Sequence, residues 1–238
     1  MSYHLAVQNL TRAFGEHYAL IELTAEFYAG EICALLGPNG AGKSTLMHLL
    51  STLMQSSEGQ ILINQKDIRR LPAHRVRSMI GYVGHQTMLY PSLTAYENLM
   101  FFARLYQLQK EHDLDSLVMN ALTEVDLSHV AHRPVQGFSR GMSQRLTLAR
   151  AFLPQPAILL LDEPFTGLDQ AGIEQSVALL QSHKDRGAII IISSHDLHTV
   201  EQIYDRLLIL KRGRLAFHGT ITEPNVSLAQ YYQQSVES

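Results

Sequence analysis

The sequence predicts an α/β fold: a mainly parallel sheet flanked by helices, with an N-terminal antiparallel β subdomain and an inserted helical lobe. Three apolar runs have the length of buried strands, at 32–36, 157–161 and 188–192. Residues 3–10 and 19–27 alternate apolar and polar side chains, which is typical of half-buried antiparallel strands. From residue 93 to 127 helical periodicity replaces the strand signal, which predicts the lobe.

A glycine-rich segment follows the first apolar run and leads into a helix-forming segment. It consists of Gly37, Pro38, Asn39, Gly40, Ala41, Gly42, Lys43, Ser44 and Thr45. This spacing matches a phosphate-binding loop, in which Lys43 reaches the β- and γ-phosphates and the Ser44 hydroxyl binds Mg²⁺. An incidental glycine-rich turn would not need the strand–loop–helix order, so we predict a P-loop NTPase that binds a nucleoside triphosphate.

Length and composition limit the class of protein. The 238 residues fit one domain, 1–238, with a helical subdomain inserted at 88–153 and a C-terminal tail at 220–238. The formal net charge is −3, so we expect no nucleic-acid partner. The single cysteine, Cys33, fits a reducing compartment, and neither a signal peptide nor a membrane-spanning apolar run is visible. We therefore expect a cytoplasmic protein.

Polar side chains follow the buried strands at the point where each strand ends. Asp162 and Glu163 follow the second apolar run, and His195 lies just after the third. Gln86 follows a shorter strand, at 80–83. Because the carboxyl ends of parallel strands share one edge of a sheet, these residues are expected near the phosphate loop. Asp162 would hold Mg²⁺ and Glu163 would take a proton from water, whereas Gln86 or His195 alone could be an ordinary loop residue.

Two further features are candidates for nucleotide contact, and neither is specific alone. An aromatic residue ahead of the loop, Phe14 or Tyr18, could stack on a base or could simply cap a turn. Ser139 is a good N-cap for a helix that reaches about residue 153. Gly141 would let an anion approach the N-terminus of that helix.

The helical lobe is expected to contain helices at 94–108 and 113–125, bounded by proline-containing turns. The first helix carries an apolar stripe, which indicates a buried face, made of Leu99, Phe102, Leu105 and Tyr106. Residues 69–78 are also expected to be helical, and the tail from about residue 223 to pack as a short helix.

Six motifs in this order resemble the nucleotide-binding domain of an ATP-binding-cassette (ABC) transporter, over about residues 5–219. They are the phosphate loop, the loop glutamine Gln86, a signature at 138–142, the Asp162–Glu163 pair, the Leu168–Asp169 loop and the switch histidine His195. The resemblance implies ATP and Mg²⁺ as cofactors. It places the metal at Ser44, Gln86 and Asp162, and it assigns catalysis to Glu163, His195 and Gln86.

The resemblance also implies a homodimer that forms with ATP. Ser139 and Gly141 would contact the γ-phosphate of the ATP held by the second copy. Phe14 is then favoured over Tyr18 as the base-stacking aromatic, and Asp169 is counted with the nucleotide-binding residues. The other expected partner is a transmembrane permease, which would place the chain on the cytosolic face of the inner or plasma membrane.

Two departures from the general pattern bear on activity and substrate. The signature reads Phe-Ser-Arg-Gly-Met at 138–142 in place of Leu-Ser-Gly-Gly-Gln, and the Met142 thioether cannot donate a hydrogen bond to phosphate. The Gly-His before Gln86 and the aromatic–Thr pair at 165–166 are similar to the ATPase subunit of the haem exporter for cytochrome c maturation. The alternatives are an exporter of another substrate, such as a lipid or a drug, a non-transport ABC ATPase, and a module that binds ATP without turnover.

Overall fold

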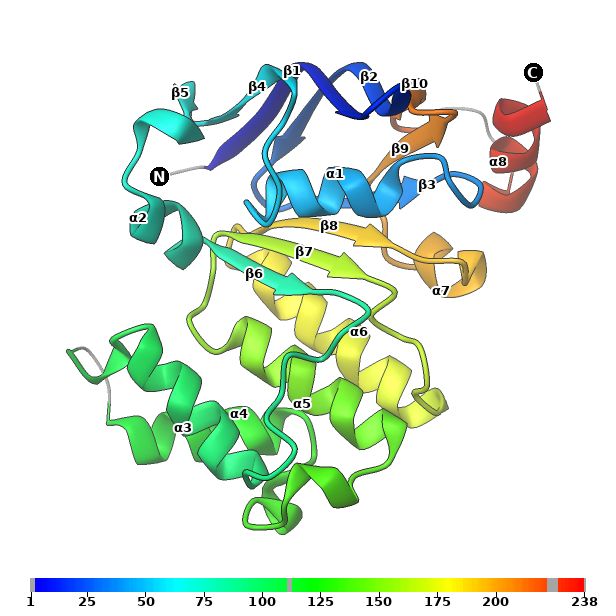
Figure 1. The fold of residues 1–238 in the computed structure, drawn as a ribbon. Coiled ribbons are helices and arrows are strands. Elements are labelled where there is room, and N and C mark those ends of the chain that lie inside the picture. Colours follow the sequence, from blue (N-terminus) through cyan, green and yellow to red (C-terminus); the bar gives the residue numbers. More distant parts are fainter. Residues whose placement is uncertain (1–2, 111–112, 222–226, 238) are drawn as a thin grey trace.

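The computed structural model describes residues 3–110, 113–221 and 227–237, which form two sheets with helices packed around them (Figure 1). The larger sheet has the strand order β10-β9-β3-β8-β7-β6. Its strands are β3 (Ile32–Leu36), β6 (Ile80–Val83), β7 (Ile158–Asp162), β8 (Ile189–Ser193), β9 (Arg206–Lys211) and β10 (Arg214–Gly219). Neighbouring strands are parallel except β9 and β10. The predicted α/β fold is therefore confirmed.

The smaller sheet is antiparallel and is built from the N-terminal part of the chain. Its order is β2-β1-β4-β5, with β1 (His4–Phe14), β2 (His17–Tyr28), β4 (Glu58–Ile63) and β5 (Lys66–Asp67). β1 and β2 extend beyond the predicted ranges because they form one hairpin that turns at Gly15, where φ is +61°. Helix α1 (Lys43–Leu50) lies between the two sheets, and its apolar side chains share one core with both (Figure 1).

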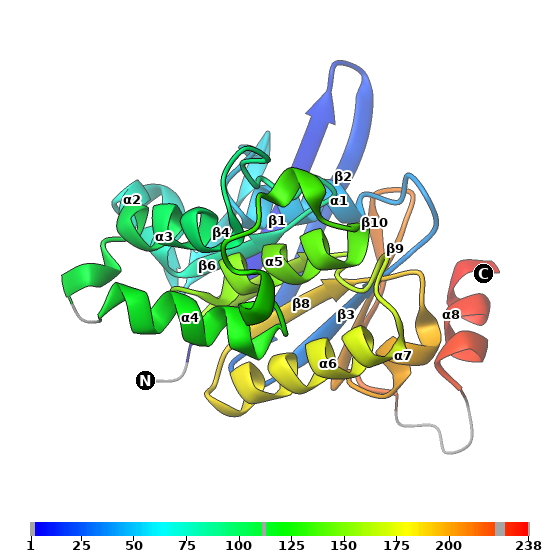
Figure 2. The same ribbon diagram turned by 90° about the horizontal axis from the view of Figure 1, so that it is seen from below.

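Helices cover both faces of the larger sheet because its strands are buried on both sides. Leu160 and Ile191 face the core that contains α1. Their neighbours Leu159 and Ile190 face α5 (Arg140–Phe152) and α6 (Gln170–Asp185) on the other side (Figure 2). The short α7 (Leu197–Glu201) and α8 (Leu228–Glu237) pack near β9, and α8 agrees with the helix expected in the tail. Residues 1, 2, 222–226 and 238 of the predicted domain and tail lie outside the described residues.

A helical lobe follows β6, as predicted. It contains α3 (Ala95–Leu105), α4 (Leu114–Glu124), the first turns of α5, and 3₁₀ turns at Leu108–Lys110, Ser128–Val130 and Val135–Gly137. The two edges of the lobe meet, because Thr94 forms a bridge with Pro134 and the Val135 N–H donates to the Leu93 carbonyl (2.9 Å). Residues 111 and 112 of the predicted lobe are not among those described.

Two local expectations were wrong. Leu105 does not belong to the buried stripe of α3, because the helix ends there and the side chain is 61% exposed. Residues 69–78 do not form one helix: a 3₁₀ turn at Ile68–Arg70 (η1) is separated from α2 (Ala73–Ser78) by Pro72, which has no N–H to continue a helix. Across the described ranges, every helix is too short or too polar to cross a membrane.

Candidate functional site

The phosphate loop owes its shape to backbone conformations that favour glycine. Gly40 and Gly42 have φ of +77° and +106°, in the left-handed region. A Cβ at Gly42 would lie 2.5 Å from the Ala19 carbonyl oxygen on β2, so glycine alone fits this contact. Gly42 is also the N-cap of α1 and supplies no side-chain cap. The N–H groups of the first turn of α1 are therefore available to an anion.

Lys43 lies at the start of α1 with its ammonium group over the loop. Nζ donates to the carbonyl oxygens of Gly37 (2.6 Å) and Pro38 (3.2 Å). Partial burial lowers the pKa of Lys43, and the nearby carboxylates of Glu163 and Asp162 oppose this shift. The ammonium thus lies where a triphosphate in the loop would meet it.

Asp162 is fixed by two serines at the ends of different elements. It ends β7 in register with Ser193, which ends β8, and the Ser193 hydroxyl donates to Asp162 Oδ1. Ser44 Oγ, in the first turn of α1, donates to Asp162 Oδ2 at 3.1 Å. Oxygen ligands at right angles on Mg²⁺ lie about 3 Å apart, so Ser44 and Asp162 have the spacing and the donor chemistry that Mg²⁺ requires.

Glu163 follows Asp162 directly and faces His195. Its φ of +54° is unusual for a residue with a side chain, and its N–H donates to the Ser193 carbonyl at 3.0 Å. The His195 N–H donates to Glu163 Oε2 at 3.4 Å, and His195 Nε2 lies 3.6 Å from Glu163 Oε1. Burial raises the pKa of Glu163, while the His195 N–H and imidazole oppose the rise. A carboxylate with a raised pKa is suited to accept a proton from water.

These residues surround a cavity of about 420 Å³. It is lined by Phe14, His17, Ala19, Asn39, Gly40, Ala41, Gly42, Lys43, Ser44, Thr45, His85, Asp162, Glu163 and His195. The structure therefore brings most of the predicted loop together with three of the predicted strand-end residues. His17 and Ser193 were missed by sequence reasoning, although Ser193 ends the third apolar run and could have been read as a strand-end polar residue.

At the end of β6, His85 and not the predicted Gln86 faces the Asp162 carboxylate in this structure. His85 lines the cavity, and its Nε2 lies 3.6 Å from Asp162 Oδ2. Gln86 is exposed and is not among the described residues that line the cavity. β6 ends at Val83, so the side chain that reaches the shared sheet edge comes two residues after the strand, not three.

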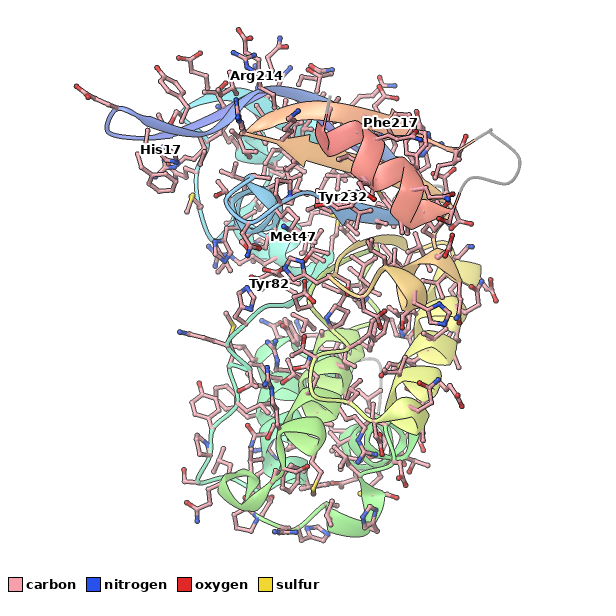
Figure 3. The ribbon with its side chains drawn as sticks, turned by 90° about the vertical axis from the view of Figure 1, so that its right-hand side faces the viewer. His17, Met47, Tyr82, Arg214, Phe217 and Tyr232 are labelled. Carbon is pink, nitrogen blue, oxygen red and sulfur yellow. The ribbon has the colours of Figure 1, made fainter. Side chains whose placement is uncertain are left out.

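The two candidate aromatics are distinguished by their positions. Phe14 lines the cavity and is 46% exposed, with the Arg12 guanidinium 4.5 Å from its ring centroid. Tyr18, on the other strand of the hairpin, is also exposed but does not line the cavity. Figure 3 shows the hairpin, with His17 labelled, extending from the body of the molecule. Phe14 is therefore the candidate aromatic at the cavity, and its stacking on a base stays a prediction.

The signature residues and Asp169 lie outside this cavity. Ser139 is the N-cap of α5 and accepts a hydrogen bond from the Met142 N–H (3.2 Å). Gly141 packs against Gly167, whose carbonyl oxygen would lie 2.9 Å from a Cβ at Gly141. Asp169 is the N-cap of α6 and accepts from the Gly172 N–H (3.0 Å). A single chain therefore does not bring its own signature to its own phosphate loop.

The chain is similar in sequence to known proteins over most of its length. The family model described as "ABC transporter" matches residues 20–166. The chain is 34% identical over 211 residues to the lantibiotic transport ATP-binding protein SrtF of Streptococcus pyogenes, which covers 89% of this chain and 88% of that protein. It is 30% identical over 220 residues to the lipopolysaccharide export system ATP-binding protein LptB of Escherichia coli, which covers 92% and 91%.

Solved structures show the same likeness. An ATP-binding subunit of an ABC transporter superposes with a TM-score of 0.90 at 31% identity, over 97% of this chain and 98% of that chain. A dimeric post-hydrolysis state of the ATP-binding cassette MJ0796, bound to ADP and Pi, gives 0.81 at 26% identity, over 92% and 99%. With the phosphate loop, the strand-end carboxylates and the helical lobe in place, the chain belongs to the ABC transporter family, as an ATP-binding subunit that hydrolyses ATP.

Proposed function

We propose that this ATPase holds ATP and Mg²⁺ in the cavity at the phosphate loop and hydrolyses ATP there. The observation that carries the proposal is the 3.1 Å contact between Ser44 Oγ and Asp162 Oδ2, directly beside Glu163. Lys43 would contact the β- and γ-phosphates, and Mg²⁺, when bound, supplies positive charge to the phosphate oxygens. Glu163 would take the proton of the attacking water, and His195, at 3.6 Å, would orient that carboxylate and the water.

Two variants test the assignment. Lys43→Ala should weaken nucleotide binding and abolish hydrolysis while the circular dichroism spectrum stays unchanged. Glu163→Gln keeps the shape of the side chain and removes the proton acceptor, so it should bind ATP and lose about 10²–10⁴-fold in turnover. Hydrolysis near the wild-type rate in Glu163→Gln would refute the general base. A wild-type protein that binds ATP without turnover would instead favour the pure binding module.

We propose further that two copies assemble around two ATP molecules. This is supported by the position of Ser139 and Gly141, which lie away from the cavity of their own chain. In the Glu163→Gln background, ATP should produce a dimer in light scattering. Ser139→Asp keeps the N-cap oxygen and places a negative charge toward the partner's γ-phosphate, so it should prevent the dimer, whereas Ser139→Asn keeps the cap without the charge and should dimerise more readily.

The other proposed partner is a transmembrane permease, which would hold the subunit on the cytosolic face of the membrane. CbiO1 of Clostridium perfringens, which is 29% identical and superposes with a TM-score of 0.78, is part of the ABC transporter complex cbiONQ. The lobe presents large exposed apolar side chains after β6, which we call the lobe patch: Met88, Tyr90, Phe101 and Leu105. Tyr90 and Phe101 are in edge contact, with ring centroids 5.0 Å apart. An apolar patch of this kind is suited to a protein partner.

The narrower proposal is that the transported substrate is haem, for cytochrome c maturation. It rests on the Gly84–His85–Gln86 sequence and on the pair Phe165–Thr166, while the relatives quoted above are named for lantibiotic and lipopolysaccharide transport. Deletion of the gene, or Lys43→Ala in the chromosome, should leave haem synthesis intact and stop covalent haem attachment to exported c-type cytochromes. Normal c-type cytochromes in a haem-peroxidase stain would refute this substrate and leave the transport ATPase standing.

A further inference from the structure

His85 brings a nitrogen donor to Asp162, the carboxylate that would hold the metal. Its Nε2 lies 3.6 Å from Asp162 Oδ2, and the same oxygen accepts a hydrogen bond from Ser44 Oγ at 3.1 Å. The His85 side chain is 71% exposed and lines the cavity at the phosphate loop. One imidazole nitrogen, one carboxylate oxygen and one hydroxyl oxygen therefore converge on the same small volume.

The loop that carries His85 is held from two sides. A Cβ at Gly84 would lie 2.3 Å from the Tyr82 hydroxyl, so Tyr82 packs directly under the loop. Tyr82 also packs against the core that contains Met47 (Figure 3). The buried Arg150 of α5 donates from Nη2 to the Tyr82 carbonyl oxygen at 2.9 Å. The backbone before His85 is thus tied to the core and to α5, which fixes where the imidazole can reach.

We infer that His85 Nε2 is a ligand of the divalent cation that accompanies ATP, and that this nitrogen shifts the preference of the site from Mg²⁺ toward Mn²⁺. The inference rests on the proposed ATP site. Cis ligands of an octahedral ion lie about 3 Å apart, so the present distance needs only a small adjustment. Both ions favour oxygen donors, but Mn²⁺, as a transition-metal ion, accepts an imidazole nitrogen more readily than Mg²⁺ does.

The small number of protein ligands indicates that the ion binds together with ATP. Among the described residues, no group of three or more His, Cys, Asp or Glu side chains could hold a metal ion. His85, Asp162 and Ser44 therefore need phosphate oxygens to complete the coordination, as in other sites where the metal is bound together with substrate phosphates. The preference for Mn²⁺ over Mg²⁺ should then appear when the metal–ATP complexes bind and not when the free ions are added.

Electron spin-echo spectroscopy of Mn²⁺ tests direct coordination without relying on activity. The full chain with Glu163→Gln, which removes turnover, is loaded with Mn²⁺·ATP, and the ¹⁴N modulation of the Mn²⁺ signal is recorded. Modulation from a bound imidazole is expected, and labelling the histidines with ¹⁵N should replace it by ¹⁵N coupling. The label separates protein nitrogen from the nitrogens of adenine.

Matched variants assign the nitrogen to one residue. In the same background, His85→Gln keeps a polar side chain and should abolish the histidine coupling, and it should lower the ratio of Mn²⁺·ATP to Mg²⁺·ATP affinity by about tenfold or more in calorimetry. His195→Gln removes the other imidazole of the cavity and should keep the coupling, as should Gln86→Ala. Tight Mn²⁺·ATP binding without histidine coupling, or coupling that is lost only in His195→Gln, would overturn the inference. Failure of either metal–ATP complex to bind would refute the proposed ATP site itself.

Discussion

His183 should make this protein lose stability in mild acid. The side chain lies in α6, is only 4% exposed, and stacks on Phe152 of α5 with ring centroids 4.6 Å apart. Burial lowers the pKa of His183 from 6.5 to about 4, and the charge of Arg186 adds to this effect. The fold therefore prefers the neutral imidazole, and protonation has to take place inside a buried aromatic contact.

The sign and size of the effect follow from this shift. An unfolded chain protonates His183 near pH 6.5, whereas the folded chain does so near pH 4, so between these values the unfolded state binds more protons. Stability is then intact above pH 6.5 and is lost as the pH falls toward 4. The full loss would be about 3 kcal/mol in the free energy of unfolding, of which about 2 kcal/mol would be lost by pH 5.

Urea unfolding of the nucleotide-free protein at pH 7.5 and pH 5.0 measures this loss. Other groups titrate in the same range, so the wild type is compared with His183→Phe, which keeps an aromatic ring on Phe152 and cannot take a proton. The variant should lose about 2 kcal/mol less than the wild type on acidification, and the same replacement of an exposed histidine, His74→Phe, should not change the loss. Equal losses in wild type and His183→Phe would refute the reasoning.

Three further predictions concern the nucleotide site and its partner. Gly42→Ala places a Cβ 2.5 Å from the Ala19 carbonyl at φ +106°, so it should destabilise by at least about 1–3 kcal/mol in urea unfolding and weaken ATP binding. Ser193→Ala removes a donor to Asp162 and should weaken Mg²⁺-dependent ATP binding about 10–100-fold in calorimetry, leaving Mg²⁺-free binding unchanged. Phe101→Asp should abolish co-purification with a membrane partner while ATP binding is retained.

Much of the fold could be predicted because the determining signals are local. Runs of apolar residues such as 188–192 are too short for helices, and they lie between helical patterns, which leaves a buried parallel sheet as the consistent solution. The helix expected from residue 94 begins at Ala95, where Thr94 and Glu97 form a capping box: the Glu97 N–H donates to Thr94 Oγ1 and the Thr94 N–H to the Glu97 carboxylate. Each of these patterns can be recognised from a few residues that are neighbours in the sequence.

The missed features depend on contacts between distant segments. Ser193 reaches Asp162 because β7 and β8 pair in a particular register, and that register cannot be inferred from the sequence of either strand alone. Whether His85 or Gln86 lines the cavity depends on where β6 ends and on the packing of Tyr82 under Gly84. A sequence motif can indicate that a polar residue of this loop faces the phosphate site. Tertiary packing determines whether that residue is His85 or Gln86.

The proposed dimer gives α5 a role at both ends. Its N-cap, Ser139, would face the ATP of the second copy, while Arg150 near its C-terminus donates to the Tyr82 carbonyl and lies 5.2 Å from the Phe102 ring centroid. A packed helix moves as a body and does not stretch, so a shift of Ser139 on dimer formation has to be absorbed at Tyr82 and Phe102. Tyr82 supports the loop of His85, and Phe102 belongs to α3, which carries Phe101 and Leu105 of the lobe patch. Within the proposed assembly, ATP at one site would therefore act, through this one helix, on the proposed metal ligand His85 and on the proposed permease-binding lobe patch of the other copy.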